Sequence, residues 1–165
     1  MTSASDVLRA AFARHTWATL GLLDALEALD PAKLDETVPG TYGSIAETLT
    51  HLVDADDRYL QRLDQPVLPP HEGHGRQPLA ELRTRVQEHD GRWTTMLDRL
   101  DAGTLERRID FIEDYPEVDG GETLLLIQAL HHGDDHRAQV CSTLGALGLE
   151  VPDLDGWSYW LTGRA

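Results

Sequence analysis

The sequence predicts an all-α protein, a four-helix bundle that forms a single domain over residues 1–165. Apolar residues recur at three- and four-residue spacing along four long segments, which is the period of an amphipathic helix. No part of the chain alternates convincingly between apolar and polar residues as the strands of a sheet would. A length of 165 residues with 41% hydrophobic residues suits one domain with a buried core. Four long helices without a sheet favour a bundle.

The first helix is expected from Ser5 to about Leu29. Its apolar positions follow the helical period, and Ser3 or Ser5 can accept a backbone hydrogen bond as the N-cap. The residue before a proline resists the α conformation, so the pair Asp30-Pro31 is expected to end this helix.

The second helix is expected from Ser44 to about Leu63 and begins with a capping box. The Ser44 hydroxyl accepts from the amide of Glu47, and the Glu47 carboxylate accepts from the Ser44 amide. Glu47 also precedes His51 by one helical turn, which gives its carboxylate a competing role as acceptor for the ring N–H of that histidine. We expect the capping role. Prolines and glycines between residues 66 and 75 predict an extended loop after the helix.

The remaining two helices are expected over residues 78–100 and 122–147. Proline is tolerated in a first helical turn, and glycine at position 148 is typical of a helix C-terminus. Between these helices, residues 109–112 are short, β-prone and flanked by charges, which predicts an irregular or strand-like link. The aromatic tail, residues 153–160, is expected to fold back over one end of the bundle.

The charge balance makes some partners improbable. The chain has 14 basic and 29 acidic residues, a formal net charge of −15 with histidine neutral. Such a surface repels phosphate backbones and anionic lipid, so we expect no nucleic-acid partner and no membrane partner. No apolar stretch approaches a membrane span, and the N-terminus does not resemble a secretory signal. The single cysteine, Cys141, suits a reducing compartment. These features predict a cytoplasmic location.

The sequence from residue 131 to 139 contains two rival pairs of candidate metal ligands, His132 with His136 and His131 with Asp135. Residues four apart lie on one face of a helix, so either pair can converge on one ion. The register through His132 and His136 continues an apolar stripe made of Leu125, Ala129, Val140, Leu144 and Leu147. The rival register becomes polar sooner. His132 and His136 are therefore the expected inward pair.

Two histidines leave a metal site incomplete, and His51 in the second helix is the best candidate for a third ligand. It lies in the more apolar stripe of that helix, where an unpaired ring would need a partner. His15 in the first helix is also placed to point inward. The other histidines outside the 131–136 segment, His71, His74 and His89, are expected to be solvated surface residues.

Several other polar or aromatic residues have ordinary structural interpretations. Asp54, Asp56 and Asp57 are expected to form an exposed acidic helix face. Cys141 is expected to be a small core residue rather than a nucleophile. The four tryptophans are expected to pack in the core or at helix ends: Trp17, Trp93, Trp157 and Trp160.

Taken together, two histidine motifs resemble the DinB/YfiT-like family, a group described as metalloenzymes. The motifs are SIAETLTHL at residues 44–52 and HGDDHRAQ at residues 132–139. The segments WATLGLLDAL at residues 17–26 and DGWSY at residues 155–159 are also similar to family members. Ala138 departs from the family, whose members commonly have glycine there; alanine is the better helix former.

The resemblance implies an up-down-down-up bundle in which three histidines hold one divalent metal ion, with zinc or nickel expected. Carried over to this chain, the ligands are His51, His132 and His136. It also implies a homodimer. Some relatives are transferases or isomerases that use low-molecular-weight thiols such as bacillithiol or mycothiol.

The leading functional hypothesis is therefore a metal-dependent transferase that acts with a small-molecule thiol and an electrophile. The alternative is a metal- or small-ligand-binding bundle without turnover, with a stress or regulatory role. A third interpretation is a purely structural bundle with hydrogen-bonded histidines. The sequence identifies no general acid or base.

Overall fold

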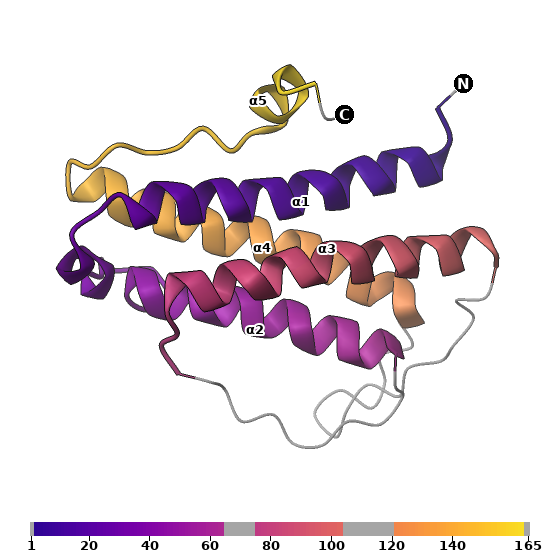
Figure 1. The fold of residues 1–165 in the computed structure, drawn as a ribbon, viewed down its shortest axis with the longest axis horizontal. Helices are drawn as coiled ribbons and strands as arrows, with labels where there is room; N and C mark the ends of the chain where they lie inside the picture. Colours follow the sequence, from indigo (N-terminus) through magenta and orange to yellow (C-terminus); the bar gives the residue numbers. More distant parts are fainter. Residues whose placement is uncertain (1, 65–74, 104–120, 164–165) are drawn as a thin grey trace.

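The computed structural model describes residues 2–64, 75–103 and 121–163, and in these ranges every regular element is helical (Figure 1). The elements are α1 (Ala4–Glu27), the short 3₁₀ helix η1 (Pro31–Asp35), α2 (Ile45–Asp64), α3 (Leu79–Asp101), α4 (Gly121–Ala146) and α5 (Gly156–Leu161). The predicted all-α class is confirmed. The predicted loop histidines, His71 and His74, and the strand-like link at 109–112 lie outside the described residues.

The four long helices form a bundle in which α1 and α4 run in one direction and α2 and α3 in the other (Figure 1). The main packing partners are α1 with α3 and α2 with α4, while α2 also contacts α3 and α1 contacts α4. Each long helix thus has two neighbours. This is the up-down-down-up order that the family resemblance implies.

The helix ends use the side chains that the sequence indicates. Ser3 caps α1 in a capping box with Asp6. Ser44 and Glu47 form the predicted box at the start of α2, with N–H···O distances of 2.9 and 3.2 Å. At the end of α4, Gly148 adopts φ +69°, a conformation that favours glycine. The predicted helix limits therefore agree with the observed ones to within a few residues.

The core consists of two apolar clusters separated by a polar layer. One cluster gathers around Leu22, Leu49 and Leu144, and the other around Phe12, Trp93 and Leu125. Between them, at the middle of each long helix, lie buried or half-buried histidines and their neighbours. All candidate ligands belong to this layer.

Two surface predictions on α2 and α3 are wrong. Asp54 and Asp56 are 5% and 3% exposed, and His89 is 3% exposed. Carboxylates can be buried here because α1 and α3 supply partners: His15 lies against Asp56, and Arg85 lies against Asp54. Asp57 is half-buried and lies between α2 and α3.

The tail runs back along α1 and ends in α5 (Figure 1). Its anchor is Tyr159, which is 5% exposed and packs on Trp17 with ring centroids 5.4 Å apart. The packing prediction holds for Trp17 and Trp93 but is wrong for Trp157 and Trp160, which are 81% and 65% exposed. Cys141 is half-buried against the first apolar cluster, as expected. None of the described helices is long and apolar enough to cross a bilayer.

Candidate metal centre

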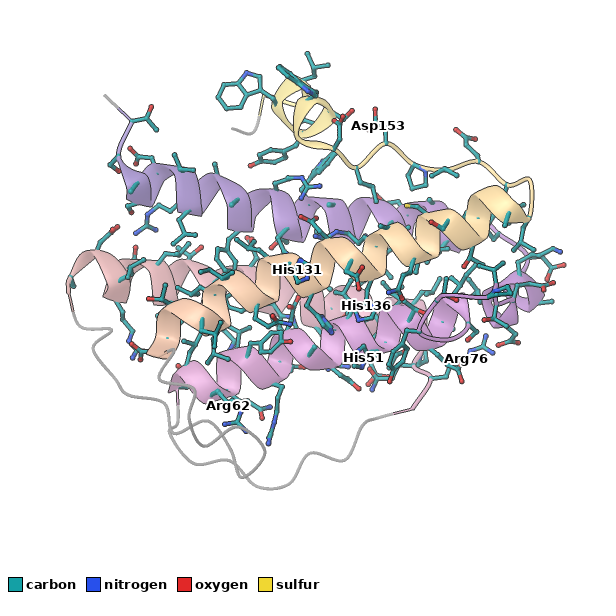
Figure 2. The ribbon with its side chains drawn as sticks, turned by 180° about the vertical axis from the view of Figure 1, so that it is seen from behind. His51, Arg62, Arg76, His131, His136 and Asp153 are labelled. Atoms are coloured by element: carbon teal, nitrogen blue, oxygen red, sulfur yellow. The ribbon has the colours of Figure 1, made fainter. Side chains whose placement is uncertain are left out.

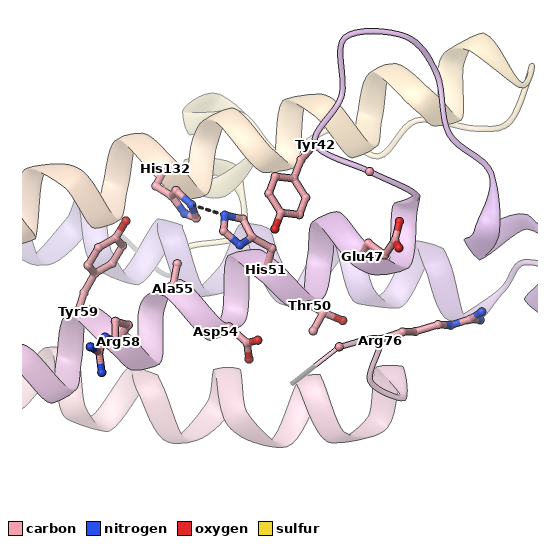
Figure 3. Close-up of a pocket in the computed structure, with 12 residues that line it drawn as sticks. Tyr42, Glu47, Thr50, His51, Asp54, Ala55, Arg58, Tyr59, Arg76 and His132 are labelled. Atoms are coloured by element: carbon pink, nitrogen blue, oxygen red, sulfur yellow. Dashed lines mark hydrogen bonds between the residues drawn. The ribbon is translucent and has the colours of Figure 1, made fainter. Parts of the chain in front are cut away.

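The fold brings the three predicted ligands together (Figures 2 and 3). His51 comes from α2, and His132 and His136 come from successive turns of α4. The Nε2 atom of His132 lies 3.1 Å from Nε2 of His51 and 3.0 Å from Nε2 of His136. One ligand atom from each ring lies within 4.8 Å of the others. The three rings therefore converge on one point.

The helix register that places these rings is the one that the apolar stripe indicates. His136 is buried and His132 is half-buried, whereas the rival residues His131 and Asp135 are exposed. Along the same rival face, Ile127 is 59% exposed. The inward orientation of the His132–His136 pair is therefore confirmed.

The orientation of the His136 ring is set by Gln139, one helical turn further along α4. The Nδ1–H of His136 donates to Oε1 of Gln139 over 3.1 Å, and the same oxygen accepts from the backbone N–H of Tyr42 over 2.9 Å. The amide nitrogen of Gln139 donates to Asp135 over 3.1 Å, which fixes the orientation of the amide. With its proton on Nδ1, His136 presents an unprotonated Nε2 to the other two rings.

Two tyrosines flank the histidines. The Tyr42 ring stacks on His51 with centroids 4.0 Å apart and an interplanar angle of 11°, and it meets His136 edge-on. Tyr59 meets His132 edge-on at 5.8 Å. Burial raises the pKa of Tyr59, so its hydroxyl stays protonated at neutral pH. Tyr42, Tyr59 and Gln139 were not predicted as site residues from the sequence; for Gln139, the three-residue spacing from His136 was the available signal.

The electrostatics of the cluster suit a cation. Burial, together with the neighbouring His136 and His51, lowers the pKa of His132 from 6.5 to about 4. A neutral ring is thus held against the Nε2 atoms of the other two histidines. Ligand nitrogens that share one ion at roughly 2.0–2.1 Å lie about 3 Å apart when the angle at the ion is near a right angle. Three imidazoles suit zinc, nickel, cobalt or iron(II), and these residues fit such an ion.

A cleft of about 650 Å³ opens beside the cluster (Figure 3). His51 and His132 form part of its wall, together with Tyr42, Ala55 and Tyr59. The histidines are accessible from this side, which would let a small molecule approach a bound ion.

The remaining buried histidines have different partners. His15 donates from Nε2 to Asp56 over 2.8 Å, and its Nδ1 faces the guanidinium of Arg137 at 3.3 Å. Nε2 of His89 lies 2.8 Å from Asp57. Burial alone would raise the pKa of the Asp57 carboxyl, but His89 and the Arg85 guanidinium hold it well below its usual range. His15 does point inward, but it does not join the three-histidine cluster.

Glu47 takes the expected capping role. Its hydrogen bonds to the Ser44 amide and hydroxyl lower the pKa of its carboxyl. These bonds occupy the carboxylate at the N-terminus of α2. The position of Glu47 is therefore explained by the capping box, without a hydrogen bond from the His51 ring.

An antiparallel pair of helices that offers three histidine nitrogens beside an open cleft is typical of mononuclear metal centres in helical bundles. The comparison with family models then specifies the class: this chain belongs to the DinB superfamily, whose model matches residues 14–140. The match covers all three candidate ligands. No curated protein and no solved structure matched the chain significantly.

Proposed function

We propose that His51, His132 and His136 hold one divalent metal ion, most readily zinc or nickel, and that the protein is a metal-dependent transferase acting with a low-molecular-weight thiol. The observation that carries the metal site is the convergence of three Nε2 atoms, two of them 3.0 and 3.1 Å from that of His132. Membership of the DinB superfamily supports it.

The metal ion would lower the pKa of a thiol or water bound to it and would supply a positive charge opposite an electrophile. The chain's own residues prepare the site for this chemistry. Gln139 keeps the proton of His136 on Nδ1, so that Nε2 faces the cluster. Tyr59, whose hydroxyl is protonated at neutral pH and is hydrogen-bonded with Gln128, forms part of the cleft wall. Apolar clusters lie on either side of the polar layer that contains the rings.

A direct test is thiol transfer by protein reconstituted with zinc or nickel. A panel of small thiols would be offered with chlorodinitrobenzene, which forms a coloured thioether and releases chloride and a proton. We expect transfer above the rate given by the same concentration of free metal, and loss of that excess in His136→Ala. Equal rates in the wild type and His136→Ala would contradict the proposal.

The second candidate is a metal-binding bundle without turnover, and one observation favours it. The two carboxylates that line the cleft, Glu47 and Asp54, are both engaged by other groups, so neither is available as a general base. This candidate predicts stoichiometric metal with no transfer for any thiol in the panel.

A further inference from the structure

The cleft beside the three histidines contains one cationic side chain that no other described residue neutralises. Four charged residues line the cleft: Glu47, Asp54, Arg58 and Arg76. Three of them have partners. Among the residues that the structure describes, Arg58 makes no hydrogen bond and no ion pair.

The partners of the other three are specific. Glu47 accepts from the backbone at the start of α2. Asp54 accepts from Arg85 of α3 over 2.7 Å, and Arg76 pairs with Asp35 of η1. These three side chains therefore have partners within the fold, whereas the guanidinium of Arg58 is free to meet a ligand in the cleft.

An uncompensated arginine is unusual in this chain, which has a net charge of −15. Carboxylates lie against eight other arginines of the described ranges: Arg9, Arg14, Arg76, Arg83, Arg85, Arg92, Arg99 and Arg137. The two carboxylates that share the cleft with Arg58 are held by other groups, Asp54 by Arg85 and Glu47 by Ser44. A guanidinium in that position is available to a ligand.

Its position relates it to the metal centre. Arg58 follows His51 by seven residues, two turns of α2, so both lie on one face of the helix with Cα atoms about 10 Å apart along the axis. Ala55, between them, also lines the cleft and leaves the space open. In Figure 3, Arg58 lies beside Tyr59, at the opposite end of the view from Arg76.

We infer that Arg58 anchors a carboxylate of the small molecule that reacts at the three-histidine centre, so that the substrate is a short anion with its reactive group at the other end. This inference rests on the proposed function. The planar guanidinium offers two parallel N–H donors to a carboxylate. Because the molecule as a whole repels anions, this local charge selects for a carboxylate placed within reach of the metal.

The test uses the cobalt-substituted protein and matched thiol probes. Mercaptoacetate, mercaptopropionate and mercaptobutyrate would each be compared with the mercaptoalcohol of equal length, and binding would be read from the thiolate-to-cobalt absorption band. We expect at least one acid to bind about tenfold more tightly than its alcohol in the wild type. Arg58→Gln should remove that preference without changing the affinity for the alcohols.

Arg62→Gln is the matched control, because Arg62 lies one turn further along α2 and does not line the cleft. It changes the net charge equally and should keep the preference for acids. An equal preference in the wild type and Arg58→Gln, or equal loss in both variants, would overturn the inference while leaving the metal site and thiol binding intact. Failure to bind cobalt at all would overturn the proposed function.

A measurement without metal separates failure of the Arg58 anchor from failure of the metal centre. Glutarate would be titrated into chelator-treated protein while the Nε–H resonance of Arg58 is followed by NMR, assigned from its loss in Arg58→Gln. We expect a saturable shift of this resonance that uncharged pentanediol does not cause. No shift with glutarate, together with no preference among the thiols, would exclude the anchor whatever the state of the metal centre.

Discussion

The polar layer of the bundle contains two groups of histidines that differ in what faces their ring nitrogens. His15 and His89 face carboxylates at 2.8 Å, those of Asp56 and Asp57. His51, His132 and His136 face one another. Both groups are buried or half-buried and both lie at the middle of the same four helices.

The difference shows what makes a histidine available as a ligand. A carboxylate accepts the ring proton and completes the polar requirement of a buried imidazole, so His15 is satisfied within the fold. In the three-histidine cluster, nitrogen faces nitrogen: Nε2 of His132 lies 3.1 Å from Nε2 of His51 and 3.0 Å from Nε2 of His136. The proposed metal ion would complete that cluster. Neither burial nor the number of histidines distinguishes the groups; the partner does.

The largest contrast between the groups should appear in metal affinity. His51→Ala removes one of three ligands, and we expect the affinity for zinc to fall on the order of a thousandfold, with the fold retained. His89→Ala leaves the three ligands in place and should keep the affinity within about threefold while lowering stability by roughly 1–3 kcal/mol. Competition with a chromophoric chelator and urea unfolding measure the two quantities.

The second test concerns the carboxylate-paired group. Asp56→Ala leaves the buried His15 without its acid, and we expect a loss of about 3 kcal/mol in the free energy of unfolding. Asp90→Ala, an exposed acid on α3, serves as the control and should change stability by less than about 0.5 kcal/mol. Similar free energies of unfolding for the two variants would show that the buried His15–Asp56 pair does not stabilise the fold.

Gln139→Leu tests whether the orientation of His136 matters to the site. The variant removes the acceptor for Nδ1–H and frees the other tautomer. We expect metal affinity to fall between about tenfold and a hundredfold, less than on loss of a ligand. An affinity equal to that of the wild type would mean that packing alone orients the ring.

Gly133→Ala tests how tightly the two groups are packed against each other. A Cβ at position 133 would lie 2.3 Å from Cε1 of the His15 ring and 2.7 Å from its Nδ1, so the buried ring must shift. We expect a net loss of about 1–2 kcal/mol by thermal or urea unfolding. Gly91→Ala in α3 has open space around its Cβ and should instead stabilise the protein by up to about 1 kcal/mol.

The last expected effect is a pH dependence of the stability of the metal-free protein. The pKa of His132 is about 4 in the fold against 6.5 ordinarily, so between these values the unfolded chain binds a proton that the folded one does not. Stability should therefore fall as the pH drops through this window. His132→Gln should flatten the curve there. Asp57, whose pKa is lowered, contributes a stabilisation that is fully present above its ordinary value of 3.8 and is lost only as the pH falls below it. If the stability of the wild type depended on pH as little as that of His132→Gln, the lowered pKa of His132 would be contradicted.

Local and periodic features made much of this structure predictable. The capping box at Ser44 and Glu47 and the glycine at position 148 fixed helix ends, because these signals act within one turn. The apolar stripe on α4 identified the inward histidine pair. The buried state of Asp56 and His89 was not predictable, because their partners come from other helices and an acidic run looks the same whether it is solvated or paired. The exposed Trp157 and Trp160 show the same limit for aromatic residues.

The central claim is that the three converging histidines bind a metal ion, and metal content per chain tests it most directly. Untagged protein, purified without chelator and incubated with zinc, nickel, cobalt or manganese, would be analysed by inductively coupled plasma mass spectrometry. His132→Ala would be compared with His131→Ala, its exposed neighbour. We expect about one equivalent in the wild type and in His131→Ala, and almost none in His132→Ala. No metal in the wild type, or equal metal in both variants, would contradict the claim.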